Sequence, residues 1–260
     1  MAGIVEGRKI LVSGARNKWS IAWHTALSLH REGAELAFSV FGEREANGVG
    51  KLIAEAGIAA PILQCNATDD AQVEAMFAEI GAHFGGTLDG LLHGVVFANK
   101  DDLAGEYVNT SQQGFNLAHD SSVYTLVTMA RAARPYLKAS GAGSIVTLTY
   151  LGAERVVPNY NIMGVAKASL EASVRYLASD LGAENIRVNA VSAGAIKTLA
   201  AGAIAGFDAM LDHVALRAPL RRTVDADEVG DAVTFLMSRL ARGVTGEVLH
   251  VDGGYNILAM

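Results

Sequence analysis

The sequence predicts a doubly wound α/β fold, with a parallel sheet of about seven strands flanked by helices. Short β-rich apolar runs alternate with longer helical patterns along all 260 residues, as in successive βαβ units. No Pro/Ser-rich linker, repeat or low-complexity block interrupts this alternation. The chain has 28 glycines and only 4 prolines, which indicates tight turns inside a folded unit. We therefore expect a single domain over residues 1–260.

Local patterns predict the elements of the N-terminal half in order. Lys9–Ser13 is typical of a first strand, and Ser20–Glu32 has the pattern of a helix. The next elements are a strand at Glu35–Val40, a helix at Arg44–Ala56 and a strand at Pro61–Cys65. A helix through His83 then begins at Asp69 or Asp70, because a short carboxylate side chain accepts hydrogen bonds from the amides of a first turn.

The C-terminal half continues the alternation with longer helices. Further buried strands are expected at Leu88–His93, Ser144–Leu148, Ile186–Val191 and Glu247–Val251. Two long helices are expected at Gln113–Leu137 and Asn161–Leu181. Apolar residues recur at helical spacing in the second one, for example at Leu170 and Val174, so this helix would cover the sheet.

Composition excludes several classes of protein. With 51% apolar residues the chain is not disordered, yet no apolar run approaches the roughly 18 residues of a membrane span. The net charge of −6 argues against a nucleic-acid partner. The single Cys65 excludes an internal disulfide and fits a cytoplasmic protein, and the N-terminus lacks the apolar core of a signal peptide. The histidines show no metal-ligand spacing, and His93 is typical of a hydrogen-bonded buried imidazole.

A candidate anion site follows the first strand. Gly14 ends that strand, and the next helix begins near Ser20 and Ile21. Backbone amides and the positive end of the helix dipole would both face a bound pyrophosphate there. Gly14 is the one glycine of the turn, so the G-x-G-x-x-G fingerprint is absent and an ordinary βα turn is the alternative.

The ends of the second and third strands bear on the choice of dinucleotide. Glu43 would repel a 2′-phosphate, whereas Arg44 would attract one. No basic pair stands there, so NADH is expected and NADPH is disfavoured. Asn66 would either hydrogen-bond an adenine amino group or serve as a solvated turn residue.

The most specific pattern pairs a tyrosine with a lysine at the start of a helix. Seven residues separate Tyr160 from Lys167, so both lie on one face, about 10 Å apart along the axis. That gap suits a nicotinamide ribose, with the phenol reaching the substrate and the ammonium reaching the sugar. We expect the ammonium to make the phenol a better acid, able to donate to an oxygen that becomes negative. An incidental aromatic residue and a surface lysine are the alternative.

Several segments occur together and in order. They are Gly14 with Ser20-Ile21-Ala22, Thr149 to Glu154, Tyr160-x6-Lys167, Arg187 to Gly194, and Val251-Asp252-Gly253-Gly254. Together they resemble the enoyl-acyl-carrier-protein reductases of bacterial fatty acid synthesis, a divergent branch of the short-chain dehydrogenase/reductases. The resemblance covers essentially the whole chain and implies a Rossmann-type fold. It also implies reduction of the 2,3 double bond of trans-2-enoyl-acyl-carrier-protein thioesters by NADH, in a homotetramer.

Two alternatives are considered, one within the same superfamily and one from another class of protein. A ketoreductase of the same superfamily would have tyrosine and lysine four residues apart, and none of the seven tyrosines has a lysine at that spacing. It would also have a serine 13 residues before the tyrosine, where Thr147 stands. A non-catalytic NAD-binding regulator would need no proton donor, so the presence of Tyr150 and Tyr160 argues against it.

The resemblance implies a role for each matching residue. Tyr160 would donate a hydrogen bond to the thioester carbonyl, Lys167 would hold the nicotinamide ribose, and Tyr150 would line the site. The other expected cofactor contacts are Gly14, Ser20, Ile21, Phe41, Asn66, Ala67, Val95, Ile196, Thr198 and Ala200. The other expected substrate contacts are Val96, Ala98, Met163, Ile204 and Phe207, with a substrate flap at about 199–210.

Some positions depart from the family's pattern. Phe41 stands where an amide residue is usual, Asn66 where an aspartate is usual, and Ala195 where a proline is common. Val96 stands in place of a glycine that faces the space above the nicotinamide ring. A branched side chain there would crowd flat aromatic inhibitors such as triclosan, so an active but triclosan-resistant reductase is expected.

Overall fold

The computed structural model describes residues 2–198, 201–203 and 206–259. In this part of the chain seven parallel strands form one sheet in the order β3-β2-β1-β4-β5-β6-β7. The strands are β1 (Lys9–Ser13), β2 (Glu35–Val40), β3 (Ile62–Gln64), β4 (Gly90–His93), β5 (Ser144–Tyr150), β6 (Arg187–Ala193) and β7 (Val248–Val251). The prediction of a doubly wound α/β fold is confirmed.

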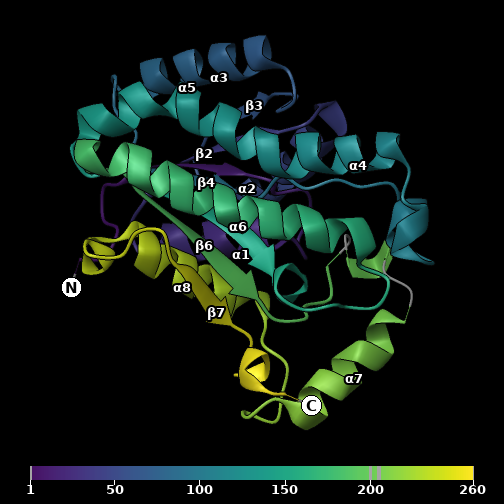
Figure 1. Ribbon diagram of the computed structural model, residues 1–260. Helices are drawn as coiled ribbons and strands as arrows, with labels where there is room; N and C mark the ends of the chain where they lie inside the picture. The colour runs from purple at the N-terminus through teal and green to yellow at the C-terminus, as the bar shows by residue number, and fades with distance from the viewer. Residues whose placement is uncertain (1, 199–200, 204–205, 260) are drawn as a thin grey trace.

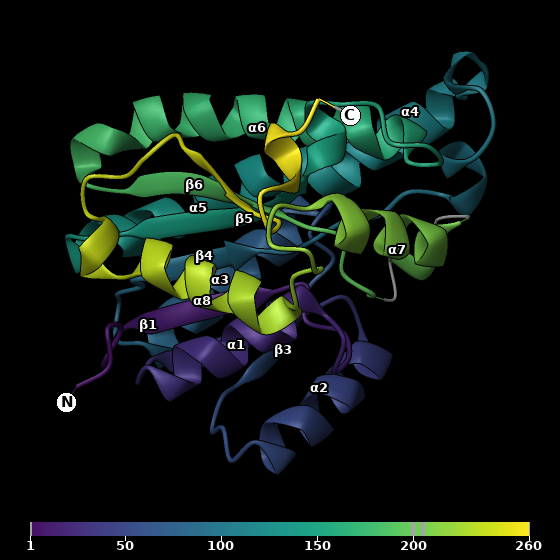
Figure 2. The ribbon, with the colours of Figure 1, turned by 90° about the horizontal axis from the view of Figure 1, so that it is seen from below.

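Helices cover both faces of the sheet (Figures 1 and 2). One face carries α3 (Asp70–His83), α4 (Gln112–His119), α5 (Thr125–Ser140) and α6 (Asn161–Leu181). The other carries α1 (Ile21–Arg31), α2 (Glu43–Glu55) and α8 (Ala226–Met237). Successive residues of β1 serve both layers, since Leu11 packs into the core on the α5 and α6 side and Ile10 into the core on the α1 and α8 side.

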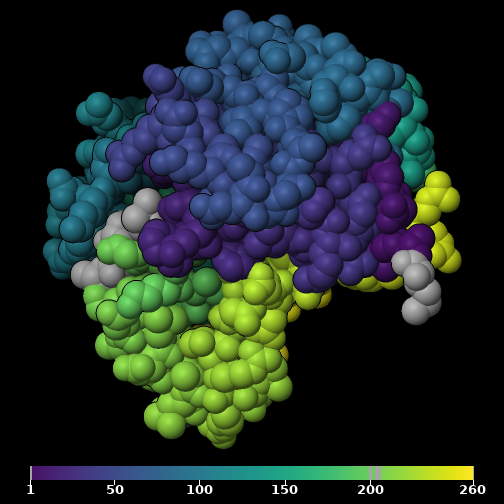
Figure 3. All heavy atoms as spheres, turned by 180° about the vertical axis from the view of Figure 1, so that it is seen from behind, coloured from purple at the N-terminus to yellow at the C-terminus, as the bar shows by residue number. Residues whose placement is uncertain are grey.

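The helix α7 (Phe207–Arg217) lies apart from these two layers (Figure 2). Figure 3 shows the yellow-green part of the chain that includes it projecting from the main body. Neither α7 nor α8 was predicted from the sequence pattern. A capping box begins α8, because Asp225 Oδ1 accepts from the Glu228 amide at 2.9 Å and Glu228 Oε2 accepts from the Asp225 amide at 3.0 Å.

The long helix expected at Gln113–Leu137 is present as an uninterrupted helical stretch from Gln112 to Ser140, but its middle is not regular α-helix. A π-helical turn at Asp120–Tyr124 separates α4 from α5. Within this turn, Ser121 Oγ lies 2.6 Å from the Leu117 carbonyl and 2.8 Å from the Phe97 carbonyl. Serine hydroxyls that bond to carbonyls compete with regular helical pairing, and π-helical turns are typical of such sites. The other long helix, α6, begins at Asn161 and ends at Leu181, as expected.

No helix in the described ranges is long and apolar enough to cross a membrane.

Candidate active site

The carboxyl ends of neighbouring strands bring most of the expected site residues to one edge of the sheet. Strands β1 and β4 are adjacent although β2 and β3 separate them in the sequence, so the strand order reverses between them. Ligands of doubly wound sheets bind at such a switch point. Gly14 follows β1, Val95, Val96 and Ala98 follow β4, Tyr150 ends β5, and Ile196 and Thr198 follow β6.

Gly14 brings the turn after β1 into contact with the turn after β4. Its φ is +88°, and a Cβ atom there would lie 2.3 Å from the Gly94 carbonyl oxygen. Only glycine satisfies both conditions. Ser20 Oγ accepts from the amides of Arg16 and Asn17, both at 3.1 Å, and makes no bond to the helix that follows. The first amides of α1, beginning at Ile21, therefore remain directed at this turn, a geometry suited to a phosphate anion.

The residues expected on the adenine side lie at the ends of β2 and β3. The Phe41 ring is 71% exposed just after β2. Asn66 Oδ1 accepts from the backbone amide and the hydroxyl of Thr68, at 3.2 and 2.8 Å. The backbone amide of Asn66 donates to Gln72 Oε1 at 2.9 Å. Asn66 thus forms a local turn, and Ala67 beside it is buried. Contacts of these residues with an adenine stay a prediction.

The two tyrosine rings pack against each other at the carboxyl end of β5. The centroids of Tyr150 and Tyr160 are 5.1 Å apart with an interplanar angle of 75°. A Cβ atom on Gly152 would lie 2.5 Å from Tyr160 Cδ1, so this glycine makes room for the ring. Asn159 and Asn161, on either side of Tyr160, have φ of +61° and +24°. Such conformations are uncommon outside glycine and often accompany functional sites.

Burial sets the ionisation of both phenols. It raises the pKa of Tyr160 above its ordinary value, with Tyr150 adding to the effect, and it raises the pKa of Tyr150 to about 12. Lys167 does not contribute to this shift, so the acidifying effect expected from its ammonium is not seen in the structure. A phenol with a raised pKa keeps its proton at neutral pH and remains a hydrogen-bond donor.

Lys167 lies inside the protein and not on its surface. Its side chain is buried, and Nζ donates to the Leu148 carbonyl at 2.7 Å. Burial lowers its pKa to about 8, and the charge of Glu171 opposes that shift. The incidental surface lysine considered as an alternative is excluded by this placement.

Two threonines of β5 make buried polar contacts with other elements that were not predicted from the sequence. The hydroxyl of Thr147 lies 2.9 Å from His93 Nδ1, and that of Thr125 lies 2.9 Å from His93 Nε2. Burial lowers the pKa of His93 to about 3, with the Lys167 charge adding to the effect, so the ring is neutral. The expectation of a hydrogen-bonded buried imidazole is confirmed. Thr149 Oγ1 donates to Glu171 Oε1 at 2.7 Å, and Glu171 is buried on α6.

One feature of the sequence could have indicated that Glu171 is a buried, partnered residue. It interrupts the apolar stripe of α6 between Leu170 and Val174, and a charged residue on a sheet-covering face needs a partner. The partners come from other elements, so the sequence spacing does not reveal them.

The remaining contacts expected for the substrate, together with the cofactor contacts Val95 and Ala200, fall into two groups. Val95, Val96 and Ala98 are half-buried and pack against the core under α5 and α6, and Met163 is buried on α6. The backbone of this wall is fixed at Phe97, whose amide and carbonyl are each 3.2 Å from Ser122 Oγ. Phe207 is buried at the start of α7. Ala200 and Ile204 lie outside the described residues.

The flap expectation is only partly covered by the described residues. Of 199–210, the structure describes a short 3-10 turn at Ala201–Ala203 and the segment from Gly206 into α7. The Tyr150 hydroxyl lies 3.6 Å from Met210 Sδ, which places the first turn of α7 beside the tyrosine pair. A flap over 199–210 stays a prediction.

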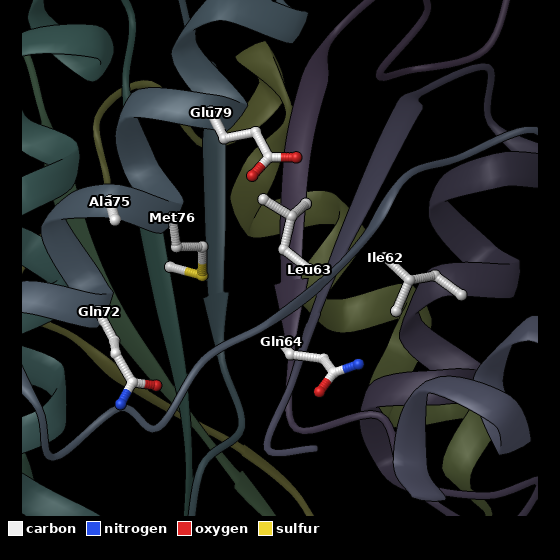
Figure 4. Close-up of a pocket in the computed structure, with 7 residues that line it drawn as sticks. All are labelled: Ile62, Leu63, Gln64, Gln72, Ala75, Met76 and Glu79. Atoms are coloured by element: carbon white, nitrogen blue, oxygen red, sulfur yellow. The ribbon is translucent and has the colours of Figure 1, made fainter. Parts of the chain in front are cut away.

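A surface groove lies elsewhere, between β3 and α3 (Figure 4). Its lining residues are Ile62, Leu63, Gln64, Gln72, Ala75, Met76 and Glu79. None of the expected site residues lines it. Among the described residues no group of three His, Cys, Asp or Glu side chains is arranged to hold a metal ion.

Comparison with known proteins covers nearly the whole chain. Residues 14–256 match the sequence family described as enoyl-(acyl carrier protein) reductase. The enoyl-[acyl-carrier-protein] reductase [NADH] FabI of Bacillus subtilis is 53% identical, over 98% of each chain. The enzyme of the same name from Escherichia coli is 48% identical, over 99% of this chain and 97% of its own.

Solved structures agree with these sequence relatives. The Bacillus cereus enoyl-acyl carrier protein reductase, in complex with NADP+ and indole naphthyridinone, is 50% identical with a TM-score of 0.96, over 99% of this chain and 100% of its own. The Anaplasma phagocytophilum reductase in complex with NAD is 40% identical with a TM-score of 0.93, over 100% of this chain and 96% of its own.

Proposed function

The chain belongs to the enoyl-(acyl carrier protein) reductase family, and from this premise we propose how its own residues carry out the reaction. It is an oxidoreductase that uses NADH to reduce the 2,3 double bond of trans-2-enoyl-acyl-carrier-protein thioesters, the last reductive step of the fatty acid elongation cycle. The observation that supports the assignment of roles is the packed Tyr150–Tyr160 pair beside buried Lys167, at the carboxyl end of β5.

The edge of the sheet between β1 and β4 fits a dinucleotide. The close approach of Gly14 to Gly94 leaves no side chain between the turn and a ligand, and the first amides of α1 face the same space. We assign the pyrophosphate to Gly14, Ser20 and Ile21, and the adenine to Phe41, Asn66 and Ala67. The nicotinamide side then falls to Val95, Lys167, Ile196 and Thr198, with Ala200 outside the described residues.

When bound, NADH supplies the hydride that adds to the β-carbon of the enoyl thioester. Tyr160 then donates a hydrogen bond to the thioester oxygen, which carries the negative charge of the resulting enolate. A proton from solvent adds to the α-carbon and completes the reduction. The raised pKa of Tyr160 suits a group that stabilises this oxygen while retaining its own proton. Tyr150 shields the oxygen from water through its packing on Tyr160 and near Met210. Lys167 binds the ribose hydroxyls through its ammonium group.

The substrate chain lies against Val96, Ala98, Met163 and Phe207, with Ile204 outside the described residues. Val96 is half-buried and its backbone is held through Phe97, so it forms a firm wall. We propose that this wall crowds flat aromatic inhibitors such as triclosan and spares the thin, flexible enoyl chain. The enzyme is then active and intrinsically triclosan-resistant.

We also propose a homotetramer, with the face of α5 and α6 as one contact between copies. This face carries Tyr176, which is 76% exposed, with Val127, Ala172 and Leu177 in a shallow depression around it. An apolar patch of this kind is typical of a subunit contact. Residues 1–260 then act as one catalytic unit in the cytoplasm, where the thiol of Cys65 stays reduced.

The test of this proposal measures loss of the reduced-nicotinamide absorbance band. NADH oxidation should require a trans-2-enoyl thioester such as crotonyl-CoA, and a 3-ketoacyl thioester should not replace it. Oxidation with the ketoacyl substrate alone would indicate a ketoreductase, and binding of NADH without turnover of either thioester would indicate a regulator. NADPH should give the higher KM, and the reverse order would direct attention to Arg44.

A further inference from the structure

A buried carboxylate lies one helical turn beyond Lys167. Lys167 and Glu171 are separated by four residues of α6, so their Cβ atoms are neighbours at about 5–6 Å. Both side chains are buried, with exposures of 6% and 7%. The rest of the buried stripe of α6 is apolar or small, so these two residues are its only buried charges in the described structure.

Strand β5 holds the two side chains in a fixed arrangement. The Leu148 carbonyl accepts from Lys167 Nζ at 2.7 Å, and the hydroxyl of the next residue, Thr149, donates to Glu171 Oε1 at 2.7 Å. Each group therefore has a hydrogen-bond partner from adjacent residues of a single strand. A buried charge that lacked both a partner and a countercharge would instead lose its proton or gain one.

Burial raises the pKa of Glu171 and lowers that of Lys167; the hydrogen bond from Thr149 opposes the shift of Glu171, and the charge of Glu171 opposes the shift of Lys167. The other group that faces Lys167 is His93 on β4, which is neutral. Glu171 is also within the influence of Arg175 on α6, of His250 on β7 and of Glu154 before α6. His250 Nε2 and Glu154 Oε1 are 2.8 Å apart, and these two residues act on the pKa of Glu171 in opposite directions. Glu171 is the one acidic group that acts on Lys167 in the described structure.

We propose that Glu171 is a positioning residue that keeps Lys167 protonated and aligned for the cofactor. The role of Lys167 toward the nicotinamide ribose rests on the proposed function, whereas its charge can be measured independently. Without the Glu171 carboxylate, burial acts on Lys167 unopposed and the ammonium loses its proton at lower pH.

The experiment compares wild-type protein with Glu171→Gln, which keeps the size and the hydrogen bond from Thr149 but removes the charge. Lysine labelled with ¹³C at Cε reports the protonation of each of the seven lysines by NMR, and Lys167→Arg identifies the signal. Glu79→Gln, which removes an exposed carboxylate on α3, is the matched control. We expect the Lys167 midpoint, about 8 in the wild type, to move down by about 1–3 pH units in Glu171→Gln and to stay in place in the control.

Cofactor affinity gives the second measurement. If the charged form alone binds the ribose, the Kd of NADH in Glu171→Gln weakens about tenfold for each pH unit above the new midpoint and recovers once the pH is below that midpoint. A purely structural loss would weaken binding at every pH. Thr149→Val, which removes the hydrogen bond and leaves the carboxylate, should give a smaller shift in the same direction.

The outcomes distinguish the role of Glu171 toward Lys167 from the proposed contact of Lys167 with the ribose. An unchanged Lys167 midpoint in folded Glu171→Gln would overturn the role of Glu171. If that variant does not fold, an unchanged midpoint in Thr149→Val would do the same. A lowered midpoint with an NADH Kd that does not depend on pH would support the role of Glu171 and overturn the proposed contact of Lys167 with the ribose.

Discussion

Tyr160 illustrates how burial selects one chemical role for a side chain. Its raised pKa makes transfer of its proton to solvent unfavourable, so its hydroxyl acts as a fixed donor at neutral pH. The neighbouring Lys167 is shifted in the opposite direction, to about 8, since burial disfavours its charged form. The site thus combines a phenol that stays neutral at neutral pH with an ammonium group whose pKa is lowered by burial, a shift that the charge of Glu171 opposes.

Replacing Tyr160 by Phe should lower kcat by about 10²- to 10³-fold, the usual cost of losing one oxyanion donor. The Kd of NADH should change little, because the hydroxyl is assigned to the substrate. Steady-state kinetics with crotonyl-CoA and a fluorescence titration with NADH measure the two quantities. Tyr107→Phe removes the hydroxyl of another exposed tyrosine and serves as the control. Wild-type turnover in Tyr160→Phe would refute the assignment.

Replacing Lys167 by Ala should act mainly on the cofactor. Loss of a charge-assisted hydrogen bond costs about 1.5–3 kcal/mol, or about 10- to 150-fold in the Kd of NADH. Isothermal titration calorimetry of Lys167→Ala measures the Kd of NADH. Lys51→Ala, which removes an exposed lysine side chain, is the control. An unchanged Kd together with reduced turnover would show that Lys167 acts on the substrate.

Val96→Gly should increase the potency of triclosan. Overpacking by a branched side chain costs about 1–3 kcal/mol, which corresponds to roughly 5- to 150-fold in inhibitor affinity. The kcat/KM for crotonyl-CoA should change far less, because a flexible chain can shift along its own axis. Inhibition curves for the natural enzyme and the variant, at saturating NAD, provide the measurement. Equal potency in the two proteins would eliminate the steric explanation.

The secondary structure elements differ in how far sequence patterns predict them. Strands buried on both faces are continuous apolar runs, so β1 and β2 were predicted with their observed bounds. The end of β5 was placed too early, at Leu148, because Thr149 and Tyr150 extend the strand only by pairing with β6 as far as Ala193. The π-helical turn between α4 and α5 coincides with tertiary hydrogen bonds from Ser121 and Ser122 to the Phe97 carbonyl, so helical periodicity does not show it.

The same distinction applies to the candidate site. The spacing of Tyr160 and Lys167 on one helix is visible in the sequence, because both belong to one element. The contacts of His93 with Thr147 and of Glu171 with Thr149 join residues 54 and 22 positions apart, and only the folded sheet brings them together. The pKa of Tyr160 likewise depends on burial, which no local pattern reports.

The capping box of α8 should make a measurable contribution to stability. Asp225→Ala removes the acceptor for the Glu228 amide and is expected to lower the free energy of unfolding by about 1 kcal/mol. Asp227→Ala in the same turn removes an exposed carboxylate that pairs with His24 and should cost less than about 0.5 kcal/mol. Urea denaturation of both variants makes the comparison. Equal losses would show that the cap itself contributes nothing specific.

For the molecule as a whole, His93 ties stability to pH. Its pKa is about 3 in the folded protein and 6.5 when unperturbed. Between these two pH values His93 is protonated in the unfolded chain and neutral in the folded protein. The free energy of unfolding therefore falls as the pH is lowered from about 6.5 toward 3, by up to about 1.4 kcal/mol per pH unit from this residue.

Urea denaturation of the wild type and of His93→Gln at several pH values between 7 and 4 measures this effect. The glutamine amide can still bond to Thr125 and Thr147 but does not titrate, so the variant should lose less stability on acidification. Histidine NMR signals in the folded wild type at pH 5 give an independent check, since His93 should remain neutral. A charged His93 at that pH, or equal acid sensitivity of the two proteins, would contradict the prediction.

Strand β5 has a consequence for how this enzyme can change over evolutionary time. Thr147, Leu148 and Thr149 in succession bind His93, Lys167 and Glu171, and Tyr150 follows directly. Because side chains alternate between the two faces of a strand, inserting or deleting one residue here would turn both threonines toward α1 and α8. A change of length that shifted the register of β5 would therefore break these contacts together. A point substitution along β5 changes one contact and leaves the others intact, so the site can vary one residue at a time.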